Sequence, residues 1–156
     1  MMFEHQSLSG PLTAQIVESL YTDALILADE VRSAFDRSAP QSLHDAAEPA
    51  TIALSIEGLR TTTRVMHVLA WILNQRAFLA GELNERQLRL HGALPRDRAS
   101  DPAQLALLDE PTRALIQQTE HMHARIARLD ELQRQEQGAL EVQVHRLQNR
   151  LRSTFG

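Results

Sequence analysis

The sequence contains no cysteine among its 156 residues, which excludes disulfide bonds, thiol nucleophiles and zinc sites of the finger type. Lysine is absent as well, so all sixteen basic residues are arginine. Aromatic residues make up only 4% of the chain. A core built from this sequence must therefore consist mainly of Leu, Ile, Val, Ala and Met side chains.

Long hydrophobic runs are also lacking. The longest apolar stretch is interrupted at His67 and falls far below the ~20 residues that a bilayer span requires. Residues 1–10 have neither a basic n-region nor an apolar h-region, so no secretory signal is visible. We therefore expect a cytoplasmic protein with no membrane contact.

Catalytic patterns are equally scarce. The glycines are scattered and form no phosphate-binding loop, and no serine lies in a nucleophile motif. The best metal candidate combines Glu120, His121 and His123 with His67 opposite. However, residues two apart on a helix diverge by roughly 200°, so His121 and His123 would not share a face. We expect no enzyme, no cofactor, no metal and no small-molecule substrate, with a small metal protein as a weaker alternative.

The charges are unevenly distributed along a chain of net charge −4. Residues 11–36 carry five acidic residues against Arg32 alone, whereas residues 51–81 carry three arginines against Glu57. No segment is basic enough for a nucleic-acid footprint, so we expect no nucleic-acid partner. A nucleic-acid-associated regulator remains an alternative, because residues 86–98 and the tail contain several arginines.

What the sequence does contain is one long helical pattern over residues 51–81, with apolar residues repeating in steps of four and three. That spacing keeps one face of a helix against a partner helix. Further apolar residues from Val65 to Leu79 point to nearly every other side, which predicts a central, deeply buried helix. The predicted seam, a core or dimer seam, consists of Ile52, Ile56, Leu59, Thr63, Met66, Ala70, Leu73 and Ala77.

A second stripe lies beside this seam and is polar except for one tryptophan. It consists of Glu57, Arg60, Arg64, His67, Trp71 and Asn74. One interpretation is a partner-binding stripe, since Arg and Trp are favoured anchors at interfaces. The other is structural: Arg60 and Arg64 would meet the acidic face of the first helix, and Trp71 would belong to the core.

Two more helices are predicted on either side of this one. The first should begin near Ser9, with Pro11 in its first turn, and end by Arg37, followed by a polar linker over residues 38–50. The third should open at Asp109 after a long loop over residues 82–108. Residues 138–156 form a tail that either continues this helix or orders only on binding.

The pattern as a whole predicts an all-α protein: a three-helix antiparallel bundle over residues 1–137, with a long central helix and a C-terminal extension. A single bundle has limited means to bury every side of residues 65–79. A homodimer is therefore expected on physical grounds.

Residues 55–82 resemble the signature of the RcdA family of alphaproteobacteria, the regulators of CtrA degradation. The matching positions are Leu59, Arg60, Thr62, Thr63, Arg64, Trp71, Gln75, Arg76, Ala77, Gly81 and Glu82. A second block, residues 108–132, is similar to that family's third helix through Arg113–Ile116 and Arg128–Asp130.

This resemblance implies a three-helix bundle, often a homodimer, without catalytic activity. It also implies an adaptor that helps the ClpXP protease capture substrates in cell-cycle control, with protein partners in the protease machinery or its cargo. The tail departs from the family in carrying a leucine heptad. A helical scaffold protein without this adaptor role is the remaining alternative.

Overall fold

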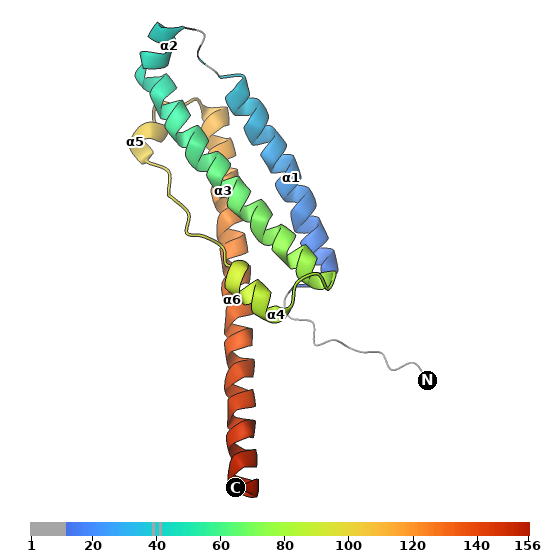
Figure 1. Ribbon diagram of the computed structural model, residues 1–156. Helices are drawn as coiled ribbons and strands as arrows, with labels where there is room; N and C mark the ends of the chain where they lie inside the picture. Colours follow the sequence, from blue (N-terminus) through green and yellow to red (C-terminus); the bar gives the residue numbers. More distant parts are fainter. Residues whose placement is uncertain (1–11, 39, 41) are drawn as a thin grey trace.

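The computed structural model describes residues 12–38, 40 and 42–156, and within them it contains helices and no strand (Figure 1). The all-α prediction is confirmed. The helices are α1 (Ala14–Asp36), α2 (Leu43–Ala47), α3 (Pro49–Leu79), α4 (Glu85–His91), α5 (Pro102–Leu105) and α6 (Glu110–Phe155). None of the helices in these residues is both long and apolar enough to cross a membrane.

Helix α1 begins where a threonine caps it. The Thr13 hydroxyl accepts a hydrogen bond from the Ile16 N–H at 3.2 Å, which satisfies one of the free donors of the first turn. The predicted start near Ser9, with Pro11 in the first turn, lies outside the described residues. The helix ends at Asp36, one residue before the predicted limit, and the linker that follows contains the short helix α2.

Helix α3 is the long central helix that the periodicity predicts, with 31 residues and a proline in its first turn. It stops at Gly81, whose φ of 78° is the left-handed conformation that glycine adopts without a Cβ penalty. The Glu82 N–H then donates to the Ala77 carbonyl at 2.9 Å, closing the end of the helix.

The relative directions of the helices differ from the prediction. Helices α1 and α3 are antiparallel, but α3 and α6 are parallel (Figure 1). The residue numbers of contacting pairs increase together along α3 and α6: Arg64 bonds to Thr119, and Trp71 bonds to Asp130. An all-antiparallel bundle is therefore wrong.

The cause of this difference is a crossover segment, residues 92–109, which carries the chain back along the length of the bundle (Figure 1). Its first ten residues have no regular structure. At ~3.3 Å per extended residue they reach roughly 33 Å, enough to return to the other end of α3. The predicted loop over residues 82–108 thus contains α4 and α5 and acts as a crossover.

The main core lies between the three long helices. Trp71 and Ile72 of α3, Leu20 of α1 and Ile126 of α6 are at most 2% exposed. A smaller cluster formed by Ala53, Leu108 and Ile116 closes the end near α5. The three long helices therefore enclose a main cluster, and a second, smaller cluster lies apart from it.

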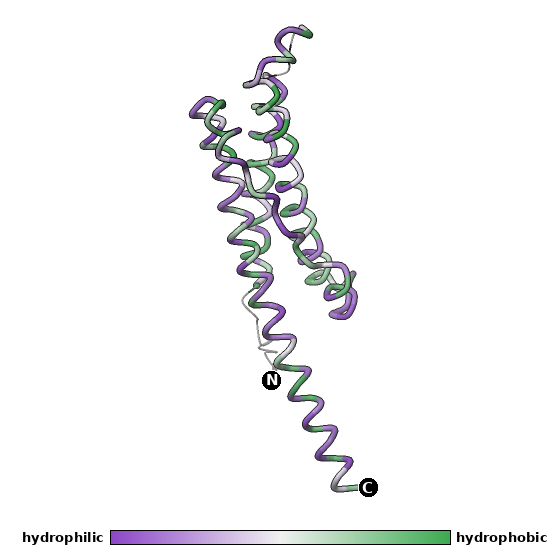
Figure 2. The backbone as a smooth tube through the Cα atoms, turned by 90° about the vertical axis from the view of Figure 1, so that its left-hand side faces the viewer, coloured by the Kyte–Doolittle hydropathy of each residue, from purple (hydrophilic) through white to green (hydrophobic). Residues whose placement is uncertain are grey.

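Helix α6 opens at Asp109 as predicted and runs for 46 residues, about 69 Å at 1.5 Å per residue. Hydrogen bonds from the Thr112 side chain and N–H lower the pKa of Asp109, so the cap is ionised at neutral pH. Residues 138–155, the α6 overhang, continue the helix and extend beyond the bundle with apolar and polar residues alternating (Figure 2). An ion pair between Arg89 and Glu141 connects α4 to the first turn of the α6 overhang.

Two helical glycines provide a matched test of how closely α1 and α3 approach. A Cβ at Gly58 would lie 2.9 Å from the Phe35 ring, whereas a Cβ at Gly138 would meet nothing within 4 Å. Gly58→Ala should therefore lower the free energy of unfolding by about 1 kcal/mol, since overpacking outweighs the gain in helix propensity. Gly138→Ala should raise it by about 0.5–1 kcal/mol. Urea unfolding measures both, and equal stabilisation by the two would contradict the close approach.

Candidate interaction surface

Helix α3 has two faces of opposite exposure. Its buried face is turned toward α1, α6 and the crossover segment. It consists of Ala53, Glu57, Gly58, Thr61, Arg64, Val65, Val68, Trp71, Ile72 and Gln75. Since successive residues of a helix are rotated by about 100°, the predicted seam lies about 180° from this face.

The predicted seam therefore points away from the interior of the chain. Leu59 is 71% exposed and Met66 60%, while Ile52 and Leu73 are each 46% exposed. Thr63 and Ala70 are exposed too, and only Ile56 and Ala77 are half-buried. The seam is wrong as an intramolecular core, because six of its eight residues are exposed and none is fully buried. As a dimer seam it stays a prediction.

This outer face of α3, the eight seam residues, carries no charge. Its exposed large side chains, Ile52, Leu59, Met66 and Leu73, recur every seven residues, and the half-buried Ile56 lies between the first two. Small side chains at positions 63, 70 and 77 recur with the same period between them. Exposed apolar surface that continues for several helical turns is typical of an interaction site. The large and small alternation favours a close helix partner.

The predicted polar stripe, in contrast, is not one exposed surface. Glu57, Arg64 and Trp71 are at most 2% exposed, and Arg60, His67 and Asn74 are half-buried. The chain's own residues cover the three buried side chains, so the prediction of a single partner-binding stripe is corrected. Trp71 belongs to the core, as the structural interpretation predicts.

Arg64 connects three parts of the fold from a position that is 1% exposed. Its Nε donates to Asp97 Oδ2 at 2.7 Å, and one terminal nitrogen donates to Thr119 Oγ1 at 3.0 Å. The other terminal nitrogen donates to the Arg98 carbonyl at 3.2 Å. The guanidinium thus pairs with the crossover segment and α6 rather than with the acidic face of α1. No local pattern in the sequence indicates these partners, which lie more than thirty residues away.

Glu57 extends the same polar network one turn earlier. Its Oε1 accepts from the Arg60 guanidinium at 2.9 Å and from the Asp101 N–H at 3.2 Å. Within the described residues, Glu57 Oε2 and Thr61 Oγ1 are buried and have no hydrogen-bond partner. Arg60 therefore pairs within α3. Like Arg64, it does not contact the acidic face of α1, where the structural interpretation placed it.

The other end of α3 is fixed to both neighbouring helices. The Trp71 indole N–H donates to Asp130 of α6 at 3.0 Å. Arg76 is the arginine that does meet α1, donating to Glu18 at 2.7 Å while its guanidinium lies 4.2 Å from the centre of the Tyr21 ring. The hydrogen bond with Glu18 raises the pKa of Arg76.

The histidines of the metal candidate do not converge. The His123 ring is 3.2 Å from the Pro95 carbonyl and holds the crossover segment, whereas His121 lines a groove between α1 and α6. In the part of the chain that the structure describes, no three His, Asp or Glu side chains are placed to hold a metal ion. The candidate surface is thus the outer face of α3, and what it can supply is apolar contact.

Comparison with known proteins gives one match. A family model described as "Protein of unknown function (DUF1465)" matches residues 9–155, which include every helix described above. No curated protein and no solved structure matches the chain. The match covers nearly the whole sequence, and the chain therefore belongs to the DUF1465 family.

Proposed function

We propose that this protein is a non-enzymatic adaptor that acts through protein–protein contacts and works as a homodimer joined through the outer face of α3. The observation that carries the proposal is the exposure of this uncharged apolar face, directly opposite the core. Leaving four large side chains in water is costly, at ~25 cal/mol per Å² of apolar surface. A second copy of the same face removes that cost.

The face is self-complementary when two copies of α3 pack antiparallel about a two-fold axis between residues 64 and 65. Leu59 then lies opposite Ala70 of the second copy, and Met66 opposite Thr63. Ile52 likewise lies opposite Ala77. In these three layers a large side chain meets a small one, which allows close packing of the kind that isologous dimers use. In the fourth layer Leu73 lies opposite Ile56, so two large side chains meet there. Arg60 falls beside His67, so no two arginines are opposed.

The resemblance of residues 55–82 to the RcdA family supports the finer proposal. The protein would deliver substrates to a ClpXP-type protease in the cytoplasm during cell-cycle control. Several residues of that signature, including Arg64 and Trp71, hold the fold together in this structure. The signature thus supports a shared bundle, and the surfaces on that bundle would contact the protease or its cargo.

The dimer is tested with Leu59→Glu/Met66→Glu, which places two carboxylates in the middle of the proposed interface. We expect the wild type to sediment as a dimer at micromolar concentration and the variant to dissociate at least 100-fold more readily. Leu140→Glu/Leu147→Glu is the matched control, because these α6 residues are 58% and 57% exposed but lie outside the interface. A monomeric wild type, or equal effects of the two variants, would contradict the proposal.

The adaptor role is tested separately with purified ClpX and ClpP. Binding of the wild-type dimer to ClpX, or faster turnover of a ClpXP substrate in its presence, is the expected result. A folded dimer that neither binds ClpX nor changes turnover of CtrA or other cell-cycle substrates would remove the adaptor proposal and leave the dimer standing.

A further inference from the structure

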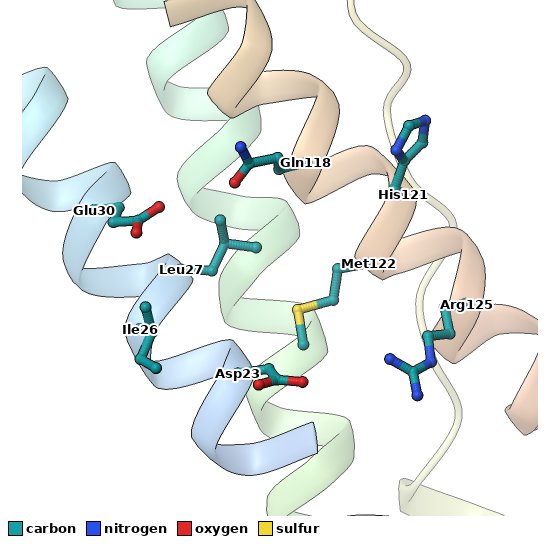
Figure 3. Close-up of a pocket in the computed structure, with 8 residues that line it drawn as sticks. All are labelled: Asp23, Ile26, Leu27, Glu30, Gln118, His121, Met122 and Arg125. Atoms are coloured by element: carbon teal, nitrogen blue, oxygen red, sulfur yellow. The ribbon is translucent and has the colours of Figure 1, made fainter. Parts of the chain in front are cut away.

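A groove runs between α1 and α6 on the side of the bundle away from the outer face of α3, and α3 itself lies behind it (Figure 3). Its volume is about 360 Å³. The floor is formed by Leu27 of α1 and Met122 of α6, and Ile26, which is 56% exposed, lines the outer edge of the groove on α1 (Figure 3). A second depression of about 500 Å³ shares Glu30 and Gln118 with it, but it has Arg37 at the end of α1 and Asp109 at the start of α6, so the charge pattern of the groove does not continue into it.

The two walls of this groove carry opposite charges. Asp23 and Glu30 lie on the α1 wall, and His121 and Arg125 lie on the α6 wall (Figure 3). Among the described residues, Asp23, Glu30 and Arg125 form no ion pair, across the groove or elsewhere. The groove therefore presents an apolar floor between one acidic and one basic wall, and both walls are free to pair with an occupant.

We propose that this groove binds an amphipathic helix of a partner protein, with apolar residues toward Ile26 and Met122, basic residues along α1 and acidic residues along α6. The groove between two neighbouring helices can bind a third helix. Such a helix inserts apolar side chains that are three and four residues apart into the groove. The charged walls determine which flank of the incoming helix faces which side and reject helices with two like flanks.

This docking site goes beyond the proposed dimer and does not depend on it. Dimerisation through the outer face of α3 would leave both grooves open, because α3 separates the groove from that face. A dimer would then carry two equivalent docking sites facing outward. For an adaptor, two such sites raise the avidity for a partner with two binding helices without any new contact.

The test uses three synthetic 18-residue helical peptides with the same leucine face and a fluorescent label. One has a Lys flank and a Glu flank, one has two Lys flanks and one has two Glu flanks. Anisotropy titrations with the full chain should show the mixed peptide binding at least tenfold more tightly than the others. Asp23→Lys/Glu30→Lys makes both walls basic and should shift the preference to the peptide with two Glu flanks.

Ile26→Asp should weaken binding of every peptide at least tenfold. Leu25→Asp, on the neighbouring position of α1 but outside the groove, should leave it unchanged. Equal binding of the three peptides, or equal effects of these two variants, would overturn the proposal. So would a change in solution mass caused by Ile26→Asp, because the occupant would then be a second copy of the chain. Peptide binding should be retained in Leu59→Glu/Met66→Glu even when the dimer is lost, because the groove does not depend on dimerisation.

Discussion

Replacing Arg64 with methionine should lower the free energy of unfolding by about 3 kcal/mol, the low end of the effect of removing one partner from a buried ion pair. The guanidinium is almost wholly buried and donates to Asp97, Thr119 and the Arg98 carbonyl. Methionine fills similar space but leaves these acceptors without a donor. The cost stays near the low end because the Asp97 side chain is 22% exposed and water can reach it.

Urea unfolding followed by circular dichroism measures this loss, and hydrogen exchange locates it. The amides of the crossover segment should exchange faster in the variant, because Arg64 binds Asp97 and the Arg98 carbonyl of that segment, alongside the contacts of Glu57 and His123. The free energy of unfolding of Arg64→Lys should lie between those of the wild type and Arg64→Met, since lysine keeps the charge but lacks the forked set of donors of a guanidinium. A loss below about 1 kcal/mol with unchanged exchange in the crossover segment would show that other contacts hold it.

The crossover segment also explains why the sequence predicted the helices but not their directions. Asp109 and Gly81 are local signals, and each marks a helix end where predicted. The direction of α6 depends on whether residues 92–101 turn tightly or run the length of the bundle. The contact between Asp97 and Arg64 favours the extended path. These residues are thirty-three positions apart, so the contact cannot be read from a local repeat in the sequence.

The inward face of α3 was hidden from the sequence for a different reason. The helix has two apolar faces with the same spacing, and periodicity alone gives no sign of which one turns inward. The more regular of the two, with Leu59 and Met66, is exposed in the chain. The buried one contains Glu57 and Arg64, which only long-range partners make tolerable. In the dimer that we propose, this regular face would meet a helix of identical sequence.

Truncating Trp71 should have an effect as large as that of removing Arg64. Trp71→Ala is expected to lower the free energy of unfolding by about 3–5 kcal/mol, because the indole is 2% exposed and packs against Leu20 and Ile126 in the centre of the core. Trp71→Phe retains much of this packing but loses the hydrogen bond to Asp130. Trp71→Phe should therefore lower the free energy of unfolding by less than Trp71→Ala does. The Asp130 carboxylate, left without the indole donor, can turn toward solvent.

Trp71 is the only tryptophan in the chain, so both variants are followed by circular dichroism instead of fluorescence. Leu140→Ala is the control, since this large side chain is 58% exposed and its truncation should change stability by less than about 0.5 kcal/mol. If Trp71→Ala cost no more than Leu140→Ala, the side of α3 assigned to the core would be wrong. The outer face would then have to be the one packed against α1 and α6, and the dimer proposal would lose its basis. The stability of a single core variant thus decides which face of α3 is free to bind a second copy.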